Sequence, residues 1–273
     1  MKTKWKIILA ILAGLVALVV WFINHPVDIR PKSLKNGIIQ EQYTQGQKLM
    51  NEVQEAYGGK KHWLSFGTGS YAQVADWYDD PLGRSGWDEL QQQFEMTSVL
   101  GTDDSELKLL NGINQGQRWG VENWESYKMI DGKKEFQHNE KYHHKLIYKN
   151  YWFQFPYRIS EAPIIAYGDK STINGIQYDI LFTTWGSEKA NWQFDQYVMY
   201  VHPETRLIEW LNFTLREKIK IINITAHFTD FQKINGITLP YSQYITLGGP
   251  HSNVKKMHEN RYQWIQFGDQ KVY

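Results

Sequence analysis

Short runs of alternating apolar and polar residues fill most of the chain after residue 63, and clusters of turn-forming residues separate them. Within residues 90–100 the alternation is regular, and the pair Asp131-Gly132 is a strong hairpin signal. Strands joined by tight turns pair with their sequence neighbours in opposite directions. The pattern therefore predicts a mostly antiparallel sheet, with strands in the second half at 176–185, 192–201, 207–216 and 219–231.

Two segments depart from this pattern and have helical spacing. Residues 39–57 carry an apolar stripe and end at Gly58-Gly59, which favours the end of a helix. Residues 139–160 have apolar side chains at helical spacing up to Pro156, where a helix would have to stop. We expect one domain over 38–273 in which a few helices cover one face of the sheet.

The N-terminus contains a third kind of segment. Residues 5–23 carry a single charge, Lys6, and as a helix they would be about 28 Å long, close to the roughly 30 Å core of a bilayer. Bulky residues at the end of the run disfavour the alternative, a cleaved signal peptide. We expect a short cytoplasmic tail and a transmembrane signal-anchor within residues 1–23, followed by a polar linker at 24–37.

Location follows from this anchor and from composition. The chain has no cysteine, which suits an oxidising compartment and removes disulfides, thiol nucleophiles and a lipidated cysteine. A long domain after an N-terminal anchor is exported as a unit. We therefore expect a single-pass protein of a bacterial inner membrane, with residues 24–273 in the periplasm and residues 5–23 as its membrane contact.

Charge and motifs exclude several functions. With 30 basic and 29 acidic residues the net charge is +1, which disfavours a nucleic-acid partner. No nucleophile elbow, phosphate-binding loop or zinc-protease motif is present. His143 and His144, near Glu140, are adjacent on a helix and point about 100° apart, so we read them as an exposed polar face. We read the acidic pairs 79–80 and 103–104 as turn residues. We expect no enzyme activity, no catalytic residue, no metal and no cofactor.

Aromatic residues are unusually abundant, with 12 Trp, 17 Tyr and 12 Phe in 273 residues. Such side chains can fill an ordinary core or line an apolar ligand cavity, and the sequence leaves both readings open. For a cavity, we expect Trp192 and Phe194 to share one strand face, because they are two residues apart. The candidate ligand-binding residues are Trp152, Phe155, Trp192, Phe194 and Trp210.

Several stretches from residue 48 onward carry a family resemblance. They are "AYGG" before Trp63, "YWFQFPYRIS", "INGIQYDILFTTWG", "DQYVMYVHPETRLI" and "HFTDFQKINGITLPYSQYI". In these stretches the chain resembles uncharacterised bacterial envelope proteins related in fold to the LolA/LolB lipoprotein carriers. The resemblance implies an open antiparallel half-barrel whose concave, aromatic-lined face is covered by helices. Carriers of that fold hold acyl chains there, but the missing lipoprotein cysteine argues against lipoprotein sorting, and no site residue carries over.

Three functions remain in view. The first is a non-enzymatic, membrane-anchored envelope protein that binds a lipid or other apolar ligand in the half-barrel. The second is a structural or assembly partner in the envelope with a fully packed core and no ligand; its protein partners are unknown. The third is a glycan-binding or hydrolytic envelope protein, which would need exposed coplanar tryptophans or facing carboxylates. A cavity between sheet and helices distinguishes the first from the second.

Overall fold

The structure is a computed structural model that describes residues 2–78, 86–217, 219–251 and 256–268. Its centre is one antiparallel sheet of 13 strands in the order β6-β5-β4-β3-β2-β1-β13-β12-β11-β10-β9-β8-β7. The first six strands are β1 (Thr68–Trp77), β2 (Gln91–Val99), β3 (Ser105–Leu109), β4 (Arg118–Glu122), β5 (Glu125–Ile130) and β6 (Lys133–Phe136). The others are β7 (Ile164–Ile173), β8 (Ile176–Thr184), β9 (Gln196–Val201), β10 (Ile208–Leu215), β11 (Ile219–Ile234), β12 (Ile237–Leu247) and β13 (His258–Phe267).

The sheet consists of two meanders joined by the first and last strands. Strands β1–β6 form one and β7–β13 the other, and β13 pairs with β1 through a ladder that shifts register between Ala72 and Gln73. Since β6 and β7 stand at the two ends of the order, the sheet is open. The predicted class, a mainly β protein with one open antiparallel sheet and helices on one face, is confirmed.

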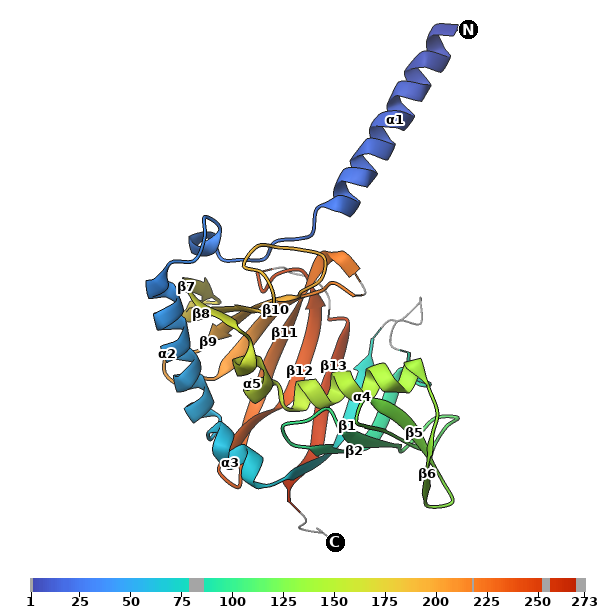
Figure 1. The fold of residues 1–273 in the computed structure, drawn as a ribbon, viewed down its shortest axis with the longest axis vertical. Coiled ribbons are helices and arrows are strands. Elements are labelled where there is room, and N and C mark those ends of the chain that lie inside the picture. The colour runs from blue at the N-terminus through green and yellow to red at the C-terminus, as the bar shows by residue number, and fades with distance from the viewer. Residues whose placement is uncertain (1, 79–85, 218, 252–255, 269–273) are drawn as a thin grey trace.

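Helices cover one face of this sheet, which we call the inner face (Figure 1). They are α2 (Gln40–Ala56), α3 (Lys60–Ser65), α4 (Glu140–Phe153) and α5 (Phe155–Arg158). Helix α4 is capped at its N-terminus by Asn139, whose side-chain oxygen accepts a hydrogen bond from the Tyr142 N–H at 3.2 Å. It ends before the Pro156 turn, as predicted, because proline can occupy only the first turn of the short helix α5.

Helix α2 approaches the sheet edge so closely that only glycine fits at the crossing. A Cβ atom on Gly46 would lie 2.6 Å from the Cα atom of Ala166 in β7. The apolar pattern of the sequence predicted this helix but no strand at β7. Inside β7, Gly168 and Asp169 resemble a turn; Asp169 has a φ of +72°, and the pairing with β8 shifts register there.

The outer face of β7–β10 is covered by the segment that follows α1 (Lys2–Asn24) and includes the 3₁₀ helix η1 (Lys32–Leu34). Leu34 is fully buried, and the Ser33 hydroxyl donates to the Gly168 carbonyl at 3.0 Å. The Ile29 N–H donates to Gln196 Oε1 at 3.1 Å. Residues 25–38 are therefore packed against the sheet, and the domain has an apolar cluster on each face.

Helix α1 projects away from the sheet (Figure 1), and the apolar side chains described along it are exposed. The prediction that residues 5–23 cross a membrane is not supported: within the described residues, no helix has both the length and the apolarity needed to span a bilayer.

Candidate functional site

The candidate site is the seam between helices α4–α5 and the inner face of β10–β13, which we call the trough. Trp152 of α4 lies at its centre. The Trp152 ring is 5.3 Å from the ring of Phe213 in β10, 6.0 Å from that of Phe228 in β11 and 5.5 Å from that of Phe155 in α5. The contact between helices and sheet is therefore made largely by aromatic rings.

A small cavity remains in the trough beside the break between α4 and α5. Its volume is about 10 Å³, enough for about one water molecule, whereas ligand pockets usually measure about 300–1,000 Å³. The trough is thus closed in this structure, and a larger ligand requires α4–α5 to move. The lining consists of Tyr57, Trp152, Phe153, Phe155, Pro156, Phe228, Leu239, Pro240, Gln243 and Tyr262.

A buried lysine lies farther along the same seam. Lys149 Nζ, on α4, donates to Gln73 Oε1 of β1 at 2.8 Å and to Asn260 Oδ1 of β13 at 2.8 Å. We call these three residues the lysine cluster. Among the described residues no carboxylate forms an ion pair with Lys149, so two neutral amides are its partners.

This environment disfavours the charged form of the lysine. Burial, with a smaller contribution from the positive charge of Lys145, lowers the pKa of Lys149 to about 7. Burial also lowers the pKa of the neighbouring His258 to about 3, with a further contribution from Lys149. The His258 ring stacks on Trp77 at 4.3 Å, and its Nδ1 atom has no hydrogen-bond partner within the described part of the chain.

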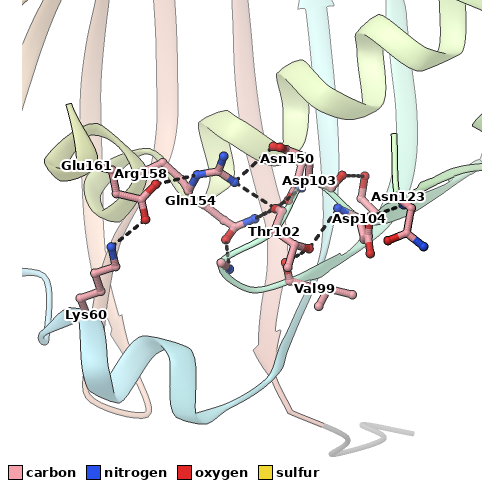
Figure 2. A network of polar contacts seen from close by, with 12 residues as sticks. Lys60, Val99, Thr102, Asp103, Asp104, Asn123, Asn150, Gln154, Arg158 and Glu161 are labelled. Atoms are coloured by element: carbon pink, nitrogen blue, oxygen red, sulfur yellow. Dashed lines mark hydrogen bonds and ion pairs between the residues drawn. The ribbon is translucent and has the colours of Figure 1, made fainter. Parts of the chain in front are cut away.

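A polar network ties the helical cover to the turn between β2 and β3 (Figure 2). The Thr102 carbonyl accepts hydrogen bonds from Asn150 Nδ2 at 2.9 Å, Gln154 Nε2 at 3.1 Å and Arg158 Nη1 at 3.1 Å. The Gly101 N–H donates to Gln154 Oε1 at 2.6 Å. We call these contacts the Thr102 latch. The three side chains that donate to the Thr102 carbonyl recur every four residues along the α4–α5 segment.

The latch continues as ion pairs toward α3. Arg158 Nη1 lies 3.2 Å from Asp103 Oδ1, and Arg158 Nε lies 3.4 Å from Glu161 Oε2. Glu161 Oε1 in turn lies 2.7 Å from Lys60 Nζ. Asp103 belongs to an acidic pair that the sequence assigned to a turn, where the structure also places it; the other pair, 79–80, lies outside the described residues.

Two of the five candidate ligand-binding residues lie in the trough, and three do not. Trp152 and Phe155 line the cavity. Trp192 and Phe194 precede β9 in the connection from β8, and do not share a strand face, because β9 begins only at Gln196. Trp210 faces the outer side of the sheet, where its ring stacks on His227 at 3.7 Å.

The histidines of α4 also have ordinary partners. His144 Nε2 lies 3.7 Å from Glu140 Oε1 and 3.7 Å from Glu217 Oε1. Across the described ranges, no three metal-ligating side chains gather in a way that could hold an ion. His143 and His144 are partly exposed on α4, where the sequence predicted an exposed polar face.

Sequence reasoning missed the lysine cluster and the latch. The apolar residues at helical spacing in this segment are Leu146, Ile147, Tyr151, Trp152 and Phe155, whereas the buried residues of α4 are Tyr142, Leu146, Lys149, Asn150 and Phe153. A signal did exist, because Lys149 and Asn150 stand three and four residues after Leu146 and so share its face. Polar residues on a buried helix face have to find partners inside the protein.

The fold is similar to several solved structures of bacterial proteins. A domain described as an outer membrane lipoprotein-sorting protein from Vibrio parahaemolyticus aligns with a TM-score of 0.51 and 7% identity, over 84% of this chain and 95% of that one. A DUF1329 family protein from Desulfovibrio piger aligns with a TM-score of 0.52 and 10% identity, over 85% and 95%. A LolA superfamily protein from Nitrosomonas europaea gives 0.49 and 10%, over 83% and 94%.

No protein-family model matches the chain, and no curated protein is significantly similar to it in sequence. At 7–10% identity the structural likeness establishes the fold alone. The open antiparallel sheet with a helical cover that the sequence resemblance implied is confirmed, and this fold is shared with the lipoprotein-sorting protein domain and the DUF1329 family protein.

Proposed function

We propose that this protein binds an acyl chain or a similar apolar ligand in the trough, beneath α4–α5, without carrying out covalent chemistry. The observation that carries the proposal is the aromatic seam itself. Trp152 and Phe155 meet Phe228 across a residual cavity, at the point where the chain breaks between α4 and α5. A helical cover with a break in it can move as a separate piece more readily than one continuous helix.

An opening breaks the interactions that hold α4–α5 on the sheet, and a bound ligand replaces part of them. The latch contributes four hydrogen bonds at Thr102 and Gly101, and at about 1 kcal/mol each they hold the cover with about 4 kcal/mol. Each buried CH₂ group of a ligand contributes about 0.8 kcal/mol. An acyl chain that buries ten such groups gains about 8 kcal/mol, which counts against the latch, the two Lys149 hydrogen bonds and the apolar side chains that α4–α5 buries on the sheet.

The closed trough also favours a second function, a structural or assembly partner with a packed core. A cavity of about 10 Å³ is what such a protein would show. The two functions differ in whether α4–α5 ever leaves the sheet. In the first the cover opens when a ligand enters, and in the second it stays closed.

One experiment on the full chain separates these functions. The protein lacks cysteine, so the pair Glu140→Cys and Gln263→Cys gives two unambiguous labelling sites, one at an exposed position of α4 and one on the exposed side of β13. We expect the distance between spin labels at these positions to lengthen when palmitate is added. Unchanged distances, together with no lipid in extracts of the gently purified protein, would favour the assembly partner.

We further propose a place in the bacterial envelope, with the sheet domain in the periplasm and α1 attaching it to a membrane. Support comes from the exposed apolar side chains along α1, such as Leu12 and Val16, which are costly to leave in water. Fractionation of cells that express the full chain tests this proposal. Recovery of the protein in the salt-washed membrane fraction is expected, and recovery in the cytosol would refute it.

A further inference from the structure

We propose that the lysine cluster, Lys149 with Gln73 and Asn260, is the head-group subsite of the trough and that it selects a single-chain amphiphile ending in a carboxylate. This inference rests on the proposed function, because the acyl chain of the same ligand would occupy the trough. It adds the ligand's chemical class: an anion rather than a neutral lipid or an alcohol.

Lys149 has no counter-charge among the described residues. A buried ammonium group is costly unless an anion pairs with it. Lys149 Nζ has two amide oxygens within hydrogen-bonding distance, at 2.8 Å each, and no carboxylate within ion-pair distance among the described residues. An ammonium group carries three N–H donors, and the third has no hydrogen-bond acceptor among the described residues, although Lys149 Nζ also lies 5.3 Å from the centroid of the Phe94 ring. An incoming carboxylate would complete the ion pair that the protein itself leaves incomplete.

The amides around Lys149 can also donate to an anion. Asn260 carries an amide NH₂ group for a carboxylate oxygen, and Gln73, whose side chain also hydrogen-bonds Tyr262, carries a second one. Asn260 lies two residues from His258, whose ring stacks on Trp77 and whose Nδ1 atom lacks a hydrogen-bond partner in the described structure. Lys145, one turn before Lys149 on α4, adds positive charge. Lys149 and Lys145 thus place positive charge beside amide groups that can donate to an anion.

The lysine cluster is continuous with the trough. Tyr262 lines the residual cavity and stands opposite Gln73 in the ladder between β13 and β1. Phe153 lines the same cavity and lies four residues after Lys149 on α4, which places both on one helix face. A ligand whose head reaches Lys149 therefore has its chain directed toward Trp152 and Phe155.

The competing explanation is that Lys149 only ties α4 to the sheet. Such a role predicts that removing the charge changes stability but not the choice between ligands. Binding of matched single-chain probes decides between the two: palmitate, 1-hexadecanol and hexadecyl phosphate share one chain and differ in the head group. Their affinities are measured with the full-length protein by displacement of a fluorescent fatty acid at pH 6.5.

We expect the wild-type chain to bind palmitate at least tenfold more tightly than hexadecanol, as a charge-assisted hydrogen bond in a buried site would give. Lys149→Met should lose about tenfold or more for palmitate and little for hexadecanol. Lys108→Met, the same change at an exposed position on β3, should alter neither affinity. If Lys149→Met does not fold, Lys149→Gln carries the test, because its amide can still bond Gln73 and Asn260.

Each remaining outcome has a distinct meaning. Equal wild-type affinities for palmitate and hexadecanol, or equal losses of both in Lys149→Met, would overturn the subsite while leaving the trough proposal intact. Failure of every probe to bind the wild-type chain would overturn the trough proposal and the subsite with it. Tighter binding of hexadecyl phosphate, lost in Lys149→Met, would overturn the assignment to a carboxylate and point to a phosphate head group.

Discussion

Replacement of Lys149 by methionine should flatten the pH dependence of stability between pH 7 and pH 9. In the folded chain, burial together with the charge of Lys145 lowers the pKa of Lys149 to about 7, whereas an unfolded lysine titrates near 10.5. Between these values the unfolded chain binds more protons than the folded chain. Folding stability therefore rises with pH in this window, because the cost of the buried charge disappears as Lys149 loses its proton.

The size of the effect follows from the two pKa values. One pKa unit corresponds to about 1.4 kcal/mol, and the difference in bound protons grows from about one half at pH 7 to almost one at pH 9. Lys149 should therefore add about 2 kcal/mol to the free energy of unfolding between pH 7 and pH 9. Methionine keeps most of the apolar volume and removes this contribution.

Other groups around Lys149 lie outside this window. The pKa of His258 is lowered by burial to about 3, so its charge changes only below pH 7. Burial raises the pKa values of Tyr71 and Tyr262, whose unfolded forms titrate near pH 10. Taking the difference between wild type and variant also cancels groups that both chains share.

The measurement is guanidinium unfolding of the full chain at pH 7, 8 and 9, followed by tryptophan fluorescence. Lys108→Met serves as the control, since it removes the same charge from an exposed position. Parallel stability curves for wild type and Lys149→Met would refute the reasoning, because they would mean that Lys149 titrates alike in the folded and unfolded chains.

Further predictions concern the latch, the outer face and the trough. Gln154→Leu should destabilise the fold by about 2–4 kcal/mol in denaturant unfolding, because it removes three hydrogen bonds of a fully buried amide; the exposed Gln137→Leu should cost under about 0.5 kcal/mol. Leu34→Ala should cost about 2–5 kcal/mol in the same assay, and a cost near zero would contradict the packing of residues 25–38 on the sheet. Trp210→Ala should lower stability by about 3–5 kcal/mol yet leave palmitate affinity unchanged, because Trp210 lies on the outer face. Phe155→Ala should weaken palmitate and hexadecanol alike, and unchanged affinity would remove Phe155 from the site.

The sequence pointed to only some of the residues that form the candidate site. Trp152 and Phe155 could be found because they belong to one helical repeat before Pro156, a pattern contained in a dozen residues. Trp210 could not be assigned to a face in the same way. Strands β8–β10 bury apolar side chains on both faces, since residues 25–38 cover the outer one, and alternation alone does not tell two apolar faces apart.

By itself the sequence determined the local elements and the class of the fold. Strands with a period of two, turns such as Asp131-Gly132, and two helices with a stop at Pro156 follow from interactions between near neighbours. Only the tertiary structure decided which elements meet. Pairing of β13 with β1 brings Gln73 and Asn260 to Lys149, from 76 and 111 residues away along the chain. Contacts over such separations depend on strand order and register, which no local pattern encodes.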